Sequence, residues 1–341
     1  MPVVLRRRRT WRTGGALATI CLLGAGCASP GAGTAAGNGG RLRVATTVAP
    51  ITSIVAAVGG DHVDVTGIVP EGTNSHTFEP KPSVAELLSV ADVVFVNGLA
   101  LEEATTHLAE MSHRDGAEIV ELGTKAIPRE RWVFDFSFPK KDGKPNPHLW
   151  TDPKYADRYA QIVRDTLVER DKHNAASYRA NYELFSKTTA ALDAAMRQAF
   201  ATIPESRRKL LTYHDAYAYF AQDYGFDVVG AIQVSDFEDP TPKEVAGLID
   251  QVRAEGVPAI FGSEVFPSPV LAQIGREAGA TYVDVLRDDD LPGRPGEPEH
   301  SWLGLMRFDY ATITRALGGD PGAIEAVDLG ATVPDRARYP Q

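Results

Sequence analysis

The longest regular pattern of apolar positions in the chain covers residues 174–203. Its apolar side chains recur at steps of three, four or seven residues, which is the period of one face of a helix. They are Tyr178, Tyr182, Phe185, Leu192, Met196, Ala199 and Phe200. No glycine or proline interrupts the segment, and Pro204 ends it because proline cannot continue the helical hydrogen bonds. The pattern predicts a helix of about 30 residues, roughly 45 Å long.

Such a helix is either a strut between two lobes or a long core helix of one large domain. The strut is favoured because strand and helix patterns alternate on both sides of it, so each flank resembles a domain by itself. We therefore expect an N-terminal lobe over residues 41–172, a linking helix over 173–204 and a C-terminal lobe over 205–320. Residues 321–341 form a C-terminal tail whose pattern assigns it no structure.

Short apolar segments predict four strands in each flank. They lie near residues 42–44, 63–69, 93–96, 118–122, 209–212, 228–231, 258–261 and 281–286. Helical patterns separate them, and this alternation predicts an α/β fold with parallel sheets covered by helices. Ser83 with Glu86, and Thr241 with Glu244, have the spacing of a capping box at a helix start, and Asp152 before Pro153 is a further cap.

The first 27 residues are expected to be a signal peptide rather than part of the fold. Five arginines precede an apolar segment, residues 16–26, that is too short to cross a bilayer as a helix. Cys27 follows Leu-Leu-Gly-Ala-Gly, which resembles the lipobox of bacterial lipoproteins, although Gly24 stands where leucine is usual. We expect export, a lipid anchor on Cys27 and a flexible tether over residues 28–40.

Composition narrows the classes of function. Cys21 and Cys27 are the only cysteines, and both lie in the leader, so the mature chain has no internal disulfide and no thiolate metal ligand. Without the leader the chain has 30 basic and 45 acidic side chains, a net charge of −15. This balance disfavours nucleic acid or an anionic membrane surface as a partner, and it suits a cationic ligand.

Four polar side chains follow predicted strands and are candidate metal ligands. His76 and His148 come after strands of the first flank, whereas His214 and Asp288 each stand two residues after a strand of the second. Ligands bind beyond the carboxyl ends of parallel strands, so these side chains can converge from both lobes in one cleft. Three imidazoles and one carboxylate suit tetrahedral Zn²⁺ without a thiolate.

Other assignments remain open on the pattern alone. The three histidines are 72 and 66 residues apart, which is not a local metal motif. Asp288, Asp289 and Asp290 are equivalent by pattern, Asp284 within the strand is a weaker candidate, and Glu264 could orient a ligand imidazole. The remaining histidines are expected at the surface; they are His62, His107, His113, His173 and His300.

The segments around the three histidines resemble the zinc/manganese-binding substrate-binding proteins of bacterial ABC importers. These segments are His76 to Pro80, Asn146 to Pro153 and His214 to Phe220, supported by Asn97-Gly98 with Glu102, Asn174 to Asn181 and Trp302 to Met306. The resemblance covers residues 41–318. It implies two (β/α) lobes joined by one rigid helix, with a metal ion at the lobe interface. The implied ligands are His76, His148, His214 and Asp288, with Asp289 as the alternative acid.

Two departures from the family pattern bear on the metal. Ser75 stands where many relatives have proline, and the loop 131–147 lacks the histidines found there in many zinc-type members. No zinc-scavenging role is therefore expected of that loop. His214 stands where manganese-type relatives often have glutamate, and imidazole favours Zn²⁺, so Mn²⁺ is the alternative ion.

The resemblance implies a monomeric, lipid-anchored extracytoplasmic receptor that delivers Zn²⁺ to the permease of an ABC importer. It is not expected to be an enzyme, since four protein ligands leave no open position for a catalytic water. Affinity is expected to fall as pH drops through about 6.5, because only neutral imidazoles bind metal. An additional adhesive role would suit a surface lipoprotein. The alternatives are a secreted zinc hydrolase, for which the chain lacks a His-Glu-x-x-His motif, and a siderophore or corrinoid carrier of the same fold.

Overall fold

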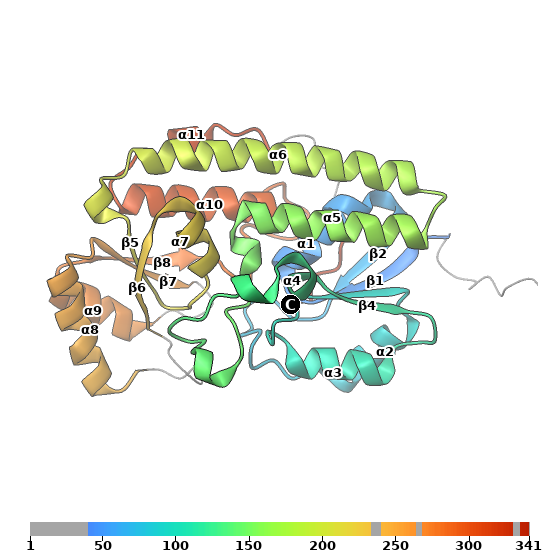
Figure 1. The fold of residues 1–341 in the computed structure, drawn as a ribbon, viewed down its shortest axis with the longest axis horizontal. Helices are drawn as coiled ribbons and strands as arrows, with labels where there is room; N and C mark the ends of the chain where they lie inside the picture. The colour runs from blue at the N-terminus through green and yellow to red at the C-terminus, as the bar shows by residue number, and fades with distance from the viewer. Residues whose placement is uncertain (1–39, 233–239, 264–267, 330–334, 341) are drawn as a thin grey trace, which may run out of the picture. The chain divides into compact units, whose positions relative to one another are not determined.

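The structure is a computed structural model that describes residues 40–232, 240–263, 268–329 and 335–340 (Figure 1). Residues 40–341 form one compact unit. The expected signal peptide, the lipidation of Cys27 and residues 28–39 of the tether fall outside the described residues, as does Glu264. Among the helices of the described residues, none has both the length and the apolar character needed to cross a bilayer.

Two four-stranded parallel sheets form the framework of the fold. The first has the order β2-β1-β3-β4, with β1 at Leu42–Thr46, β2 at Val63–Gly67, β3 at Val93–Val96 and β4 at Glu118–Glu121. The second has the order β6-β5-β7-β8, with β5 at Lys209–Thr212, β6 at Asp227–Ala231, β7 at Ala259–Ser263 and β8 at Thr281–Leu286. The strand order is the same in both sheets, and every pairing is parallel. The predicted α/β class with two parallel sheets is confirmed.

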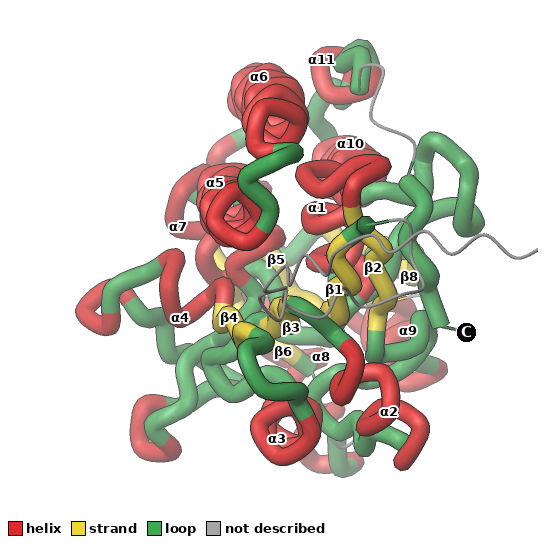
Figure 2. Tube along the Cα trace, turned by 90° about the vertical axis from the view of Figure 1, so that its right-hand side faces the viewer, coloured by secondary structure: helices red, strands yellow, loops and turns green. Residues whose placement is uncertain are grey.

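The helices fall into two groups, which precede and follow the long helix α6 (Ala175–Ala201). Those before the long helix are α1 (Ala49–Gly59), α2 (Pro82–Val90), α3 (Glu103–Ser112), α4 (Leu122–Ala126) and α5 (Pro153–Arg170). Those after it are α7 (Ala218–Tyr224), α8 (Pro242–Glu255), α9 (Pro269–Ala278), α10 (Trp302–Ala316) and α11 (Gly322–Glu325). Figure 2 shows α1, α5, α6 and α10 on one side of the first sheet, and α2 and α3 on the other.

Two of the three predicted helix caps are present. The Thr241 hydroxyl accepts from the backbone of Glu244, whose carboxylate accepts from the backbone of Thr241, which is a complete capping box. Asp152 accepts a hydrogen bond from Lys154 N at 2.9 Å. The predicted box at Ser83 is wrong, because α2 already begins at Pro82. A proline at the first helical position has its φ angle fixed for a helix and no N–H to satisfy, so it starts the helix without a side-chain cap.

The long helix α6 covers Ala175–Ala201, which is 27 residues. Every residue of the predicted stripe except Tyr182 is fully buried on it. Figure 1 shows α6 lying above α5 on one side and above α10 on the other. Beneath it, one hydrophobic cluster contains side chains from both lobes, among them Ile54, Phe220 and Trp302. The helix therefore lies over a core that the two lobes share.

The end of the chain returns to the first sheet. Arg338 forms a parallel bridge with Thr66 at the free edge of β2. Gly67 N donates to Arg338 O at 2.9 Å, and Arg338 N donates to Val65 O at 3.0 Å. Residues 335–340, hereafter the C-terminal strap, thus extend the edge of the sheet that leads into the loop of His76.

Candidate metal centre

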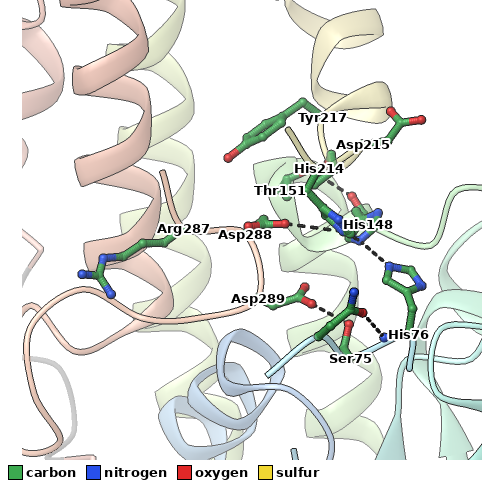
Figure 3. Close-up of polar contacts among 12 residues, drawn as sticks. Ser75, His76, His148, Thr151, His214, Asp215, Tyr217, Arg287, Asp288 and Asp289 are labelled. Atoms are coloured by element: carbon green, nitrogen blue, oxygen red, sulfur yellow. Dashed lines mark hydrogen bonds and ion pairs between the residues drawn. The ribbon is translucent and has the colours of Figure 1, made fainter. Parts of the chain in front are cut away.

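Each predicted ligand stands beyond the carboxyl end of a strand, on a separate loop. His76 ends the loop that follows β2, and His148 precedes a single 3₁₀ turn, Leu149–Thr151, that leads into α5. His214 follows β5 directly, and Asp288 follows β8. Figure 3 shows these four side chains gathered in one place, with dashed contacts that join His76 to His148 and Asp288 to the histidines. The same-edge geometry of parallel strands accounts for their convergence.

The three imidazoles face one another through their Nε2 atoms. His148 Nε2 lies 2.9 Å from His214 Nε2 and 3.3 Å from His76 Nε2. Ring centroids are 4.7 to 5.2 Å apart, and one nitrogen from each ring lies within 4.8 Å of the other two. Two nitrogens bound to one tetrahedral Zn²⁺ are about 3.3 Å apart, given Zn–N bonds of about 2.05 Å. The separations of His148 from His76 and from His214 are therefore close to what such an ion requires.

Asp288 reaches this cluster through His214. Its Oδ2 lies 3.5 Å from His214 Nε2, and the residue is 5% exposed. Its backbone oxygen accepts a hydrogen bond of 2.8 Å from the indole of Trp150. At the start of the same loop, Arg287 N donates to the buried carboxylate of Asp309 in α10 at 3.1 Å. These two contacts hold the backbone of the loop on either side of the Asp288 carboxylate.

Asn146 fixes the orientation of His148. Its side-chain oxygen accepts from His148 N at 3.1 Å and lies 2.8 Å from His148 Nδ1. An amide oxygen only accepts, so Nδ1 carries the proton and Nε2 presents its lone pair to the cluster. The Asn146 amide in turn donates to Asp215 O at 2.7 Å and to the Asp135 carboxylate at 3.0 Å. The ring is thus locked in one tautomer.

The sequence did not predict that asparagines would orient the histidines, although a local signal for this role exists. Asn74 stands two residues before His76, just as Asn146 stands two residues before His148, and its side chain accepts from His76 N at 2.9 Å. An asparagine side chain that accepts a hydrogen bond from the backbone N–H two residues later forms an Asx turn. In the sequence this turn corresponds to a short Asn-x-His pattern. Further support for the second loop comes from Asn97, whose amide donates to Pro147 O at 3.0 Å.

The other predicted acids are arranged differently. Asp289 accepts a hydrogen bond of 2.5 Å from Ser75, which connects the loops of the two lobes. Loss of solvent, followed by repulsion from Asp288, raises the pKa of Asp289 to about 6. Asp290 accepts from Gly72 N at 2.8 Å. Asp284 is exposed on β8, whereas the histidine cluster is enclosed.

Burial favours the neutral form of two of the three imidazoles. Loss of solvent lowers the pKa of His76 and of His148 well below the usual value, and nearby His214 lowers both further. His148 and His214 are buried, whereas His76 is partly exposed. A cavity of about 380 Å³ lies on the His76 side, lined also by Leu99, Phe138 and Lys144. Neutral imidazoles are the form that binds metal, so the site is ready for an ion at neutral pH.

The remaining histidines lie away from the cluster. His107, His113 and His173 are exposed and His62 is partly exposed. The surface assignment of His300 is wrong, because that residue is only 2% exposed. The C-terminal strap covers it: Tyr339 lies edge-on against the His300 ring with centroids 4.6 Å apart.

Comparison with known proteins gives a consistent result. Residues 44–316 match the model of a family described as zinc-uptake complex component A, periplasmic. The manganese-binding lipoprotein MntA of Halalkalibacterium halodurans is 30% identical over 87% of this chain and 95% of its own. The iron-binding protein YfeA of Yersinia pestis is 29% identical over 82% of this chain and 87% of its own. The structure of the periplasmic zinc-binding protein TroA of Treponema pallidum has the same fold, with a TM-score of 0.73 at 23% identity over 82% of this chain and 99% of its own.

Proposed function

This chain belongs to the family of zinc-uptake complex component A, and we propose that it captures Zn²⁺ outside the cytoplasm and delivers it to the permease of an ABC importer. The family comprises metal-binding components of importers, as the resemblance in the sequence implied. The observation that carries the proposal is the convergence of three imidazole nitrogens, from three distant loops, within 4.8 Å of one another.

His76, His148, His214 and Asp288 are the proposed ligands of the ion. The short Nε2 separations and the lone pair that Asn146 directs inward support the three histidines. The 3.5 Å approach of Asp288 to His214 supports the carboxylate as the fourth ligand. We do not assign a catalytic role, because a tetrahedral ion held by four protein ligands has no open position for a reacting water.

Zn²⁺ is preferred to Mn²⁺ because of the third imidazole. One relative is named for manganese and another for iron, so the family alone does not specify the ion. Nitrogen ligands suit Zn²⁺, whereas Mn²⁺ is better served by a larger share of carboxylate oxygens. A set of three nitrogens and one carboxylate therefore favours zinc binding by this chain.

The proposed receptor is a monomer anchored to the membrane through a lipid on Cys27. A relative named as a lipoprotein supports this anchor. Release of the ion is proposed to occur by movement of the loops 71–76 and 287–300, because the shared core beneath α6 opposes independent rotation of the lobes. A large interlobe rotation between metal-bound and metal-free forms would contradict this mode of release.

Calorimetry on single variants tests the assignment. The metal-free protein would be titrated with Zn²⁺ and with Mn²⁺, alongside His148→Ala, Asp288→Ala and the exposed control His173→Ala. We expect one tight zinc site that the control preserves and that each ligand variant weakens at least 100-fold. A folded His148→Ala variant with the affinity of the original chain would refute the site, and tighter binding of Mn²⁺ would refute the choice of ion.

A further inference from the structure

The C-terminal strap touches two of the four loops that carry proposed ligands, the loop of His76 and the loop of Asp288. It lies beyond residues 44–316, so the family match does not account for it. On the N-terminal side, Glu71 N donates to Pro340 O at 3.2 Å, five residues before His76. On the other side, Tyr339 packs against His300 in the loop that begins next to Asp288. The strap therefore spans the junction of the two loops.

Glu71 connects the strap to this junction. Its carboxylate accepts from Leu291 N at 3.3 Å and lies 3.8 Å from His300 Nε2. Gly72 and Ser75 add the hydrogen bonds to Asp290 and Asp289 described above. Glu71, Gly72 and Ser75 thus join the loop of His76 directly to the loop of Asp288, and the strap lies against both loops at this junction.

The strap is itself firmly seated. Besides the backbone bonds to β2, Arg338 Nε donates to Thr66 Oγ1 at 3.0 Å, and the Tyr339 hydroxyl donates to Asp335 at 2.5 Å. The approach is close: a β-carbon on Gly67 would lie 3.3 Å from Pro340 Cδ. His300 is buried beneath it, and its ring nitrogens make no hydrogen bond within the described residues. Such a contact cannot persist if the loops separate while the strap stays on β2.

We propose that the C-terminal strap is a clasp that holds the His76 and Asp288 loops together and thereby slows loss of the bound ion. This inference rests on the proposed function. An ion held by ligands from both loops escapes only when those loops part. Each strap contact broken at that moment raises the barrier to release, whereas entry of the ion into the open form is little affected.

Stopped-flow release of Zn²⁺ into an excess of a chromogenic chelator tests the clasp. The variants are a deletion of residues 335–341, Tyr339→Ala, and the control Arg336→Ala, whose exposed ion pair with Asp61 belongs to the same segment but touches neither loop. We expect the dissociation rate constant to rise about tenfold in the deletion and several-fold in Tyr339→Ala, since affinity changes reside mainly in dissociation. Arg336→Ala should match the original chain.

A second control separates the clasp from a general loss of stability. Ile274→Val removes one methylene from the core of the second lobe, far from the strap, and lowers the melting temperature without touching either loop. The clasp is refuted if the folded deletion releases zinc within twofold of the original rate, or if Ile274→Val accelerates release as much for an equal loss of melting temperature. If the deletion does not fold, Tyr339→Ala decides by the same criterion. An original chain that binds no zinc would instead refute the proposed function.

Discussion

Replacing Asn146 by alanine tests whether the site depends on the orientation of His148. The substitution removes the oxygen that accepts from His148 N and from His148 Nδ1, at 3.1 and 2.8 Å. It also removes the amide donor to Asp215 O. The His148 ring is then free to adopt the other tautomer or to rotate, and only part of its population presents a lone pair to the ion.

The expected magnitude follows from these contacts. Removing the partner that orients a ligand histidine typically weakens metal binding by about 10- to 100-fold. That range corresponds to about 1.4 to 2.7 kcal/mol of binding free energy. The substitution also leaves His148 N and Asp215 O without their partner, and each loss lowers the free energy of unfolding by about 1 to 3 kcal/mol. Zinc affinity and stability should therefore both fall, for different reasons.

The assay is competition for Zn²⁺ against a chelator of known affinity at pH 7.5, with the melting temperature of the metal-free protein measured in parallel. Asn181→Ala is the matched control. Asn181 lies on α6, and its side-chain amide donates to the backbone oxygen of Val58 on α1, so the variant also removes one amide donor to a backbone oxygen. It should lower stability and leave zinc affinity unchanged. A folded Asn146→Ala variant whose dissociation constant stays within twofold of the original would refute the argument from tautomer and orientation.

Three further predictions concern pH, the Asp288 loop and the core. Burial lowers the pKa of His76 and His148, which corrects the expectation that zinc affinity falls as pH drops through about 6.5. Both rings stay neutral well below pH 6.5, so the calorimetric zinc affinity should hold at pH 6.5 and fall only at lower pH. A tenfold loss of affinity by pH 6.5 would contradict this. In the metal-free chain the same two rings contribute stability that is complete above about pH 6.5 and is lost as pH falls from there toward their lowered pKa values. Trp150→Phe leaves Asp288 O without its donor, and we expect zinc binding to weaken several-fold in competition titrations, an effect that would be absent if the indole only fills space. Trp302→Ala removes a fully buried indole and should cost about 3 to 5 kcal/mol in urea unfolding; a loss below about 1 kcal/mol would show that the core repacks.

The features that could be predicted from the sequence are those with local signals. The strand–helix alternation and the helical stripe on α6 reflect side-chain periodicity, which the chain carries wherever an element faces a core. The position of the histidines in loops that follow strands was enough to expect them at one edge of the sheets. Which of the neighbouring acids approaches the cluster was not, because Asp288, Asp289 and Asp290 differ only in the direction their side chains take in a turn.

The features that could not be predicted depend on contacts between distant segments. His300 looks like a polar loop residue until the C-terminal strap covers it. The strap has no periodic pattern, because its backbone bonds to β2 make few demands on its side chains. The shared core beneath α6 was also hidden, since an apolar stripe shows that a helix is buried but not which elements it is buried against.

If the three imidazoles hold an ion as proposed, their unequal exposure imposes an order of events on its arrival. His76 lines the cavity and is partly exposed, whereas His148 and His214 are buried and do not line it. An ion that enters through this cavity exchanges its first water for the outermost ring and sheds the rest only as it moves inward. Departure by the same path runs in reverse, so the outermost ring is the last protein ligand that the ion leaves.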